Sequence, residues 1–106
     1  MKNKKKLETI IQNVSLKDLE LEQRELWLRA KVAMEFVSLR EKKKMTLVAV
    51  ASKMGVSFQQ VAKFENLVNS PTLTFLVKYA IALGTNVKIM LEGSDLLEVS
   101  NERPKI

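Results

Sequence analysis

The apolar positions of this chain recur at helical spacing over most of its length. Residues 7–14 carry apolar side chains spaced as in a short amphipathic helix. Residues 16–43 contain no Gly or Pro and repeat apolar side chains at intervals of three and four, which predicts one long helix or two helices broken near residues 22–25. Ser15 followed by Asp18 resembles a capping box, so we expect the long helical stretch to begin there.

Three shorter helices are predicted beyond residue 44, and each follows a hydroxyl side chain that can cap its first turn. Thr46 precedes the predicted helix 47–54, Ser57 the helix 58–66 and Thr72 the helix 73–83. Gly55 and Gly84 supply the backbone freedom needed directly after two of these helices. A turn at residues 69–71, which includes Pro71, separates the last two helices.

The C-terminal third changes its pattern. Val87, Ile89 and Leu91 alternate with other side chains at the period of a half-buried β-strand. A single strand is unstable without a neighbour, so we expect it to pair with a two-fold mate or to extend the sheet of a partner protein. The predicted fold class is all-α, with five helices and one short C-terminal strand.

Three regions follow from these patterns. Residues 1–25 form a basic tail and a helical N-terminal extension, residues 26–92 form the main domain, which ends in the strand, and residues 93–106 form a polar tail. Trp27 is the only tryptophan and lies between two leucines. Three adjacent bulky apolar side chains cannot all face one helical stripe, so Trp27 is expected either in the core or in an interface.

The amino-acid composition excludes most small-enzyme mechanisms. The chain of 106 residues has room for one compact domain, and it contains no cysteine and no histidine. Thiol catalysis, thiolate zinc sites and imidazole acid–base chemistry are therefore excluded. The densest acidic cluster, Glu20, Glu22 and Glu25, lacks glycines to shape a loop and fits a solvated helix face better than a cation site. We expect no enzymatic activity, no metal and no cofactor.

Neither a signal peptide nor a membrane span is predicted. Residues 1–6 are basic, but polar side chains interrupt the stretch that follows, so it lacks the unbroken apolar core of a signal peptide. The longest wholly apolar runs, at 47–51 and 79–83, are far shorter than the about 20 residues that cross a bilayer. The expectation is a cytoplasmic protein without membrane contact.

The net charge of +6 is unevenly placed along the chain. Residues 1–70 hold fourteen basic and eight acidic side chains, whereas residues 71–106 hold four of each. The segment 40–64 alone carries a net charge of +5, with three consecutive lysines at 42–44. This distribution favours nucleic acid as the partner of the first two thirds, and it leaves the neutral last third for packing and protein contact.

The helices 47–54 and 58–66 meet the geometric need of a helix-turn-helix, in which the second helix enters the major groove while the first crosses the DNA backbone. Ala51 is small where two such helices approach closely. The apolar positions that would hold the pair together are Val50, Met54, Val56, Val61 and Phe64.

The segment 39–84 resembles the helix-turn-helix class of phage repressors, Cro proteins and xenobiotic-response-element regulators. The matching positions are Leu39, Arg40, Thr46, Ala51, Gly55, Val56, Ser57, Val61, Glu65, Pro71, Thr72, Leu73, Leu76, Ala80, Ala82, Leu83 and Gly84. The resemblance implies a lambda-repressor-like helical bundle that acts as a sequence-specific DNA-binding repressor. It also implies a structural ion pair between Arg40 and Glu65.

A narrower resemblance is to the HigA-type antitoxins of toxin–antitoxin modules, and it rests on the chain length, the helical extension and the stretch 83–91. In those proteins the helix-turn-helix binds the module's own operator and the rest of the chain holds a ribonuclease toxin. The implied partners are a palindromic operator in double-stranded DNA, a second copy of the chain and a toxin ribonuclease. Two alternatives stay open: a stand-alone phage-type repressor, and a protein-interaction module that has lost specific DNA reading.

The exposed face of the second helix carries most of the expected DNA contacts. A glutamine can pair its amide with adenine, a lysine can donate to guanine or phosphate, and a phenylalanine can press on a thymine methyl group. The capping hydroxyls stand at helix N-termini, which also suit phosphate. The residues expected to contact DNA are Thr46, Ser57, Phe58, Gln59, Gln60, Lys63, Asn66 and Lys44.

Three positions depart from the family pattern. Leu47 stands where a glutamine usually helps to fix the first helix to a phosphate, and Phe58 replaces a frequently polar residue. Leu67 replaces the usual glycine after the second helix. These departures predict a weaker DNA affinity than is typical of the class, and Leu67 predicts an altered exit from the second helix.

Overall fold

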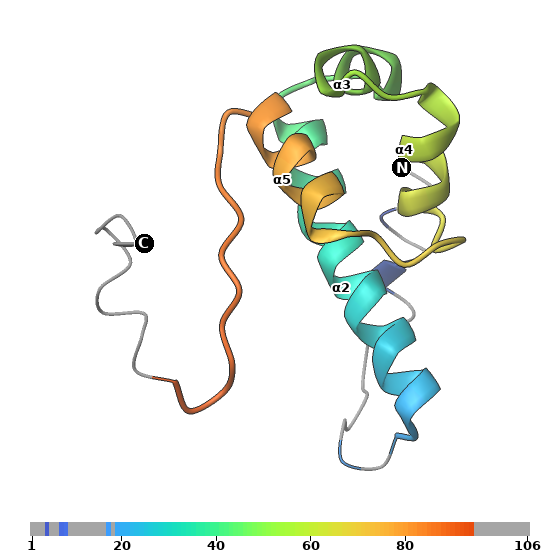
Figure 1. Cartoon of the computed structure of the whole chain (residues 1–106), viewed down its shortest axis with the longest axis vertical. Coiled ribbons are helices and arrows are strands. Elements are labelled where there is room, and N and C mark those ends of the chain that lie inside the picture. The colour runs from blue at the N-terminus through green and yellow to red at the C-terminus, as the bar shows by residue number, and fades with distance from the viewer. Residues whose placement is uncertain (1–3, 5–6, 9–16, 18, 95–106) are drawn as a thin grey trace.

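The computed structural model describes residues 4, 7–8, 17 and 19–94. Within this part of the chain the regular structure is helical, and four helices form the body of the molecule (Figure 1). They are α2 (Leu21–Lys42), α3 (Leu47–Met54), α4 (Phe58–Glu65) and α5 (Leu73–Ala82). The all-α architecture expected from the periodicity is confirmed.

Helix α2 is a single helix without a break near residues 22–25. It begins at Leu21, because Glu20 has an extended backbone and takes the cap position, where its N–H donates to Oε1 of Gln23 at 3.0 Å. The expected start near residue 16 is therefore wrong, since Leu19 and Glu20 are not helical. The predicted capping box at Ser15 and most of the predicted helix 7–14 lie outside the described residues.

The three predicted caps of the shorter helices are confirmed. The hydroxyl of Thr46 accepts from the N–H of Ala49 at 3.0 Å, and the hydroxyl of Thr72 accepts from the N–H of Phe75 at 3.0 Å. The hydroxyl of Ser57 accepts from the N–H of Gln60 at 3.2 Å. Each bond satisfies a backbone donor that the first turn of a helix leaves unpaired, and so the helices start where the hydroxyl residues stand.

Each of the four helices is followed, one or two positions after its last residue, by a residue with a left-handed backbone. Two of these residues are glycines, Gly55 with φ 71° and Gly84 with φ 76°, as the sequence predicted. The other two carry side chains, Lys44 with φ 56° and Leu67 with φ 61°. At Leu67 the backbone N–H of the next residue, Val68, reaches back to the carbonyl of Lys63 at 2.9 Å, which closes the helix end as a glycine would. The expected change in the exit of this helix is therefore not observed.

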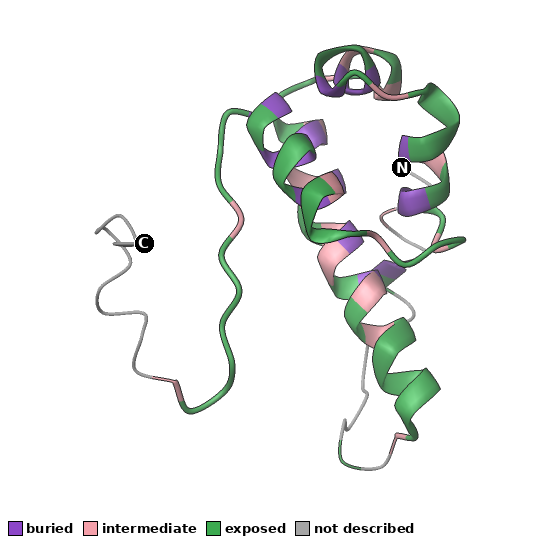
Figure 2. Cartoon of the chain, viewed as in Figure 1, coloured by how far each residue is buried: buried purple, intermediate pink, exposed green. Residues whose placement is uncertain are grey.

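The core lies where the inner faces of the helices meet (Figure 2). Small residues of α2, Ala30 and Ala33, are fully buried, which lets the other helices approach closely. A cluster of aromatic rings fills the centre, with Phe36 and Tyr79 4.6 Å apart and Phe64 and Phe75 5.2 Å apart between ring centroids. Such ring pairs add stabilisation to the burial of apolar area.

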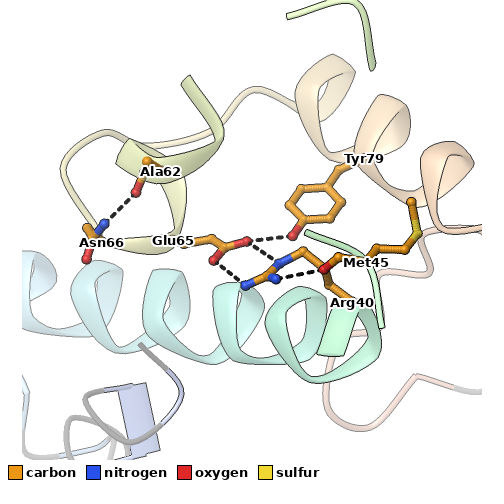
Figure 3. A network of polar contacts seen from close by, with 6 residues as sticks. All are labelled: Arg40, Met45, Ala62, Glu65, Asn66 and Tyr79. Atoms are coloured by element: carbon orange, nitrogen blue, oxygen red, sulfur yellow. Dashed lines mark hydrogen bonds and ion pairs between the residues drawn. The ribbon is translucent and has the colours of Figure 1, made fainter. Parts of the chain in front are cut away.

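Inside this core a polar network joins three helices (Figure 3). Arg40 of α2 and Glu65 of α4 form a bidentate ion pair, in which both N–O distances are 3.0 Å. A further guanidinium nitrogen of Arg40 donates to the carbonyl of Met45 at 3.0 Å, and the hydroxyl of Tyr79 donates to Glu65 at 2.6 Å. The predicted ion pair is confirmed, and Tyr79 is a member that the sequence did not indicate.

The loop between α4 and α5 is tied to the N-terminal half of α2. Arg29 donates to the carbonyl of Leu67 at 3.2 Å, and its Nε lies 3.8 Å from Glu25. The hydroxyl of Ser70 donates to the same carboxylate. Trp27, which lies between Glu25 and Arg29 in the sequence, is half-buried. The ammonium group of Lys31 lies 5.1 Å from the centre of the Trp27 ring. The indole N–H has no hydrogen-bond partner among the described residues.

The strand expected at residues 87–91 is not formed in this single chain. The described residues 85–91 have no regular structure and run as an extended segment beside the helical body, with Val87 packed against the core (Figure 1). A strand needs a neighbour to complete its hydrogen bonds, and no other described segment supplies one. In the described residues no helix is long and apolar enough to cross a membrane.

Candidate nucleic-acid interface

Helices α3 and α4 pack as a helix-turn-helix. The turn between them consists of Gly55, Val56 and Ser57, and it brings the two helices into direct contact. Four of the five apolar residues expected to hold the pair together, Val50, Met54, Val61 and Phe64, are buried, and Val56 is half-buried against the core. The small Ala51 is buried as well. Both helices are thereby anchored to the core.

All eight residues expected to contact DNA have exposed side chains. Phe58, Gln59 and Lys63 lie on the outer side of α4, because Val61 and Phe64 point inward. Phe58 is the first residue of α4 and remains 45% exposed, so its ring is open to solvent rather than part of the core. An aromatic ring, an amide and an ammonium group therefore share one short helix face.

The two adjacent glutamines have different environments. Oε1 of Gln60 accepts from the backbone N–H of Ser57 at 3.0 Å, and Ser57 in turn caps Gln60, so the pair forms a capping box at the start of α4. Reading adenine with two hydrogen bonds would take the Gln60 amide away from this cap. Gln59 makes no side-chain hydrogen bond within the described chain, and its amide is free to pair with an external group.

Asn66 and Lys44 stand at helix ends. Asn66 follows the last residue of α4, and its Nδ2 donates to the carbonyl of Ala62 at 2.8 Å. Its amide is therefore bound to its own helix and lies at the opposite end of α4 from Gln59. Lys44 lies in the left-handed position after α2 and is exposed, together with Lys42 and Lys43.

The capping hydroxyls of Thr46 and Ser57 are both engaged with their own helices. What they leave available is the helix N-terminus, where backbone N–H groups and the helix dipole suit an anion. Neither α3 nor α4 has an acidic residue in its first turn. Leu47, at the first position of α3, packs against the core, so this side chain gives no polar contact to a phosphate.

The electrostatic field around α3 and α4 is positive. Five exposed lysines belong to these helices or to the end of α2, and none forms an ion pair with another described residue. The one acidic residue of the pair, Glu65, is neutralised by Arg40 in the core. The five lysines are Lys42, Lys43, Lys44, Lys53 and Lys63.

The core beneath these helices holds a phenol with a shifted pKa. Burial raises the pKa of the Tyr79 phenol well above its ordinary value, and the adjacent Glu65 carboxylate raises it further.

Comparisons with known proteins agree with this geometry. The sequence model of a helix-turn-helix family matches residues 38–89, from the last turn of α2 to the segment beyond α5. Two relatives, each named antitoxin HigA1 and found in the CDC 1551 and H37Rv strains of Mycobacterium tuberculosis, are 36% identical over 63 residues. The aligned stretch covers 59% of this chain and 42% of each relative, so it spans less than half of their length. No solved structure matches the chain. The chain therefore carries a helix-turn-helix domain of this family over residues 38–89.

Proposed function

We propose that this protein is a sequence-specific DNA-binding repressor and that α4 is its reading helix. The observation that carries the proposal is the outer face of α4, where Phe58, Gln59 and Lys63 project from a rigid helix. A helix of this kind fits the major groove, whose width is about 12 Å. The exposed lysines around it supply attraction to phosphate without reading sequence.

The reading roles follow from side-chain chemistry. Gln59 pairs its free amide with N6 and N7 of adenine, and Lys63 donates to O6 or N7 of guanine. Phe58 contacts the methyl group of thymine. Gln60 stays in the capping box, so its contribution is to hold the first turn of α4 in shape.

The backbone contacts position the domain on the duplex. The N-termini of α3 and α4, at Thr46 and Ser57, face phosphates with their free N–H groups. Lys44, an exposed residue two positions before Thr46, adds a positive charge. Asn66 contributes at the far end of α4 through the one side-chain N–H proton that its bond to Ala62 leaves unused.

Repression works by occupancy of the DNA. A two-fold homodimer places two copies of α4 in successive major grooves, about 34 Å apart, and prevents polymerase from reaching the promoter. The two-fold symmetry requires a palindromic operator. In this arrangement the main domain, residues 26–92, binds DNA. Residues 1–25 and 93–106 flank this domain. The proposed site of action is the cytoplasm.

The biological setting we propose is a toxin–antitoxin module in which the protein represses its own operon and holds a toxin ribonuclease. The 36% identity over 63 residues to two proteins named antitoxin HigA1 supports this setting. The alternatives are a stand-alone repressor and an interaction module without specific reading. A reading frame for a small basic protein beside this gene distinguishes the first alternative from the module.

The test is the binding of purified full-length protein to its own promoter fragment and to a scrambled fragment of equal length, at physiological salt. We expect a promoter affinity at least about 1000-fold higher than that for the scrambled fragment. The dependence of the affinity on salt counts the phosphate contacts. Equal affinity for the two fragments would reject the repressor and leave the interaction module.

A further inference from the structure

Two side chains on one face of α2 hold the end of the reading helix α4. Arg40 forms the buried ion pair with Glu65, the last residue of α4. Arg29 donates from its guanidinium to the carbonyl of Leu67 at 3.2 Å, two residues further along the chain. Arg29 and Arg40 are separated by about three turns of α2, so their side chains leave the same side of this helix. The end of α4 is therefore bound at two separate points along α2.

Glu25 extends the second of these contacts into the loop between α4 and α5. Its carboxylate accepts from the hydroxyl of Ser70 and lies 3.8 Å from Nε of Arg29. Glu25 and Arg29 are four residues apart in α2, a spacing that places their side chains next to each other. The carbonyl of Leu67 and the hydroxyl of Ser70 are thus held by neighbouring side chains of one helix. We call Glu25, Arg29, Leu67 and Ser70 the loop clasp.

Apolar packing alone holds this loop weakly. Val68, Asn69 and Ser70 are exposed, and Val68 is 59% exposed although it is apolar. An open hollow of about 200 Å³ lies between α4, the loop and the start of α5, and its lining includes the rings of Phe64 and Phe75. Close packing is what normally prevents the movement of one element against another. Because packing is incomplete beside the loop, its polar contacts carry more of the restraint.

We infer that Arg29 and Glu25 position α4 for DNA reading, because the loop clasp sets the angle at which this helix crosses α2. The inference rests on the reading role proposed above. Apolar contacts such as those of Val61 and Phe64 are not directional, so they hold α4 to the core while allowing small rotations. Hydrogen bonds constrain both a distance and an angle. The Arg40 ion pair acts as the pivot, and the loop clasp fixes the angle about it.

The reading residues lie at the end of α4 that is remote from the loop clasp. Gln59 is in the first turn of α4, whereas Leu67 follows its last turn. The eight residues of α4 span about 12 Å, so a tilt of about 5° displaces the first turn by about 1 Å. This displacement exceeds the range of about 0.5 Å over which N–H···O bonds form. A small error in the angle of α4 therefore costs Gln59 its contact with a base.

The exposure of the loop clasp separates its positioning role from a role in stability. The side chain of Glu25 is 51% exposed, and Ser70 is exposed as well. Exposed ion pairs contribute little to stability. Loss of the loop clasp is therefore expected to change the angle of α4 more than the free energy of unfolding. The Arg40–Glu65 pair differs in this respect, because breaking it leaves a buried charge.

The first test measures the ratio of affinities for the promoter fragment and the scrambled fragment. Arg24→Ala is the matched control for Arg29→Ala, because Arg24 also lies in α2 and donates to a backbone carbonyl, that of Leu19 at 3.0 Å, outside the loop clasp. Each variant loses one positive charge, so binding to scrambled DNA is expected to weaken equally in both. We expect the ratio to fall about ten-fold in Arg29→Ala, through the loss of about one base contact, and to stay within about two-fold of wild type in Arg24→Ala. Arg29→Lys keeps the charge and a donor, and it is expected to restore the ratio to within about three-fold of wild type.

The second test measures the angle of α4 without DNA. Gln59→Cys and Glu35→Cys in one chain carry two spin labels, since both positions are exposed and the natural sequence contains no cysteine. Double electron–electron resonance gives the distribution of distances between the labels. We expect Arg29→Ala to broaden this distribution to at least about 1.5 times its wild-type width, and Arg24→Ala to leave it unchanged. Ser70→Ala removes one contact of the loop clasp at an exposed position, and it is expected to broaden the distribution less and to lower the ratio less.

The inference requires both results. An Arg29→Ala chain that matches Arg24→Ala in either the affinity ratio or the label distances would overturn it, and so would a lowered ratio that Arg29→Lys does not raise. If Arg29→Ala does not fold, Ser70→Ala decides by the same two measurements, and a wild-type value in either one counts against the inference. Equal affinity of the wild-type chain for the two fragments rejects the proposed function instead. The label distances then decide alone whether the loop clasp sets the angle of α4.

Discussion

The carboxylate of Glu65 at the end of α4 is held by the guanidinium of Arg40 through two contacts of 3.0 Å, and both side chains are almost fully buried. This relationship fixes the C-terminal end of the reading helix to α2. Tyr79 adds a hydrogen bond from α5, so three helices meet at one carboxylate. The orientation of α4 therefore depends on a buried polar centre as well as on apolar packing.

The ion pair predicts unequal costs for two substitutions. Glu65→Ala leaves the Arg40 guanidinium buried without its counter-charge, and we expect it to lower the free energy of unfolding by about 3–5 kcal/mol. Tyr79→Phe removes one hydrogen bond and keeps the ion pair, so the expected cost is about 1–3 kcal/mol. Urea unfolding followed by circular dichroism measures both. Equal costs for the two variants would contradict a central role for the ion pair.

The buried phenol of Tyr79 predicts a loss of stability at alkaline pH. Its pKa is raised in the folded chain, so above the ordinary value of about 10 the unfolded chain releases a proton that the folded chain retains. The stabilisation is complete below pH about 10 and falls as the pH rises beyond it. We expect the wild-type chain to lose stability faster than Tyr79→Phe between pH about 9.5 and 11. Parallel curves for the two chains in urea unfolding would exclude this contribution.

At position 67, glycine is expected to be more stable than alanine, because the backbone there is left-handed. Its φ of 61° is costly for a residue with a side chain, by about 1–2 kcal/mol, whereas glycine adopts it freely. Leu67→Gly also loses the packing of a half-buried side chain, so the proper comparison is with Leu67→Ala, which loses most of that packing and keeps the backbone cost. We expect Leu67→Gly to be more stable than Leu67→Ala by about 1 kcal/mol in urea unfolding.

A second left-handed position provides an independent check. Lys44 is exposed, so Lys44→Gly loses little packing and is expected to raise the stability relative to Lys44→Ala by a similar amount. The matched control is Ser52, an exposed residue inside α3, where Ser52→Gly is expected to be less stable than Ser52→Ala. A glycine penalty of the same size at all three positions would show that the two helix ends carry no backbone cost.

Much of the fold follows from local signals in the sequence. Thr46, Ser57 and Thr72 begin their helices as predicted, because a capping hydroxyl satisfies a backbone donor within three residues. The start of α2 did not follow, since Glu20 and Gln23 form the cap that Ser15 and Asp18 were expected to provide. Glutamate is not among the preferred N-cap residues, so the local pattern did not indicate Glu20 as the cap of α2.

The exposure of the candidate site residues was predictable from the sequence, whereas their hydrogen-bond partners were less so. Exposure of Gln59 and Lys63 follows from the helical period, because Val61 and Phe64 occupy the inner face. The bond from Ser57 to Gln60 was also readable as a capping box with glutamine at the third position, although both glutamines were expected to contact DNA. Tyr79 could not be placed from local pattern, since its partner Glu65 is fourteen residues away on another helix.

The difference between the two glutamines leads to a paired prediction. Gln60→Ala removes one half of the capping box and is expected to lower stability by about 0.5–1 kcal/mol while leaving the preference for the promoter fragment within about two-fold of wild type. Gln59→Ala is expected to leave stability unchanged and to reduce that preference by about ten-fold or more, because one bidentate contact to adenine is lost. Thermal unfolding and DNA binding of both variants check the assignment. The reverse pattern would make Gln60 the reader.

The most direct test of the reading role of α4 is the promoter preference of Gln59→Ala combined with Lys63→Ala, measured as the ratio of affinities for the promoter fragment and a scrambled fragment. Both side chains are exposed, so we expect the double variant to keep wild-type stability and the ratio to fall to nearly one. Binding to scrambled DNA is expected to weaken only slightly, through the loss of one positive charge. A ratio that stays at the wild-type value in the folded double variant would contradict the assignment of α4 as the reading helix.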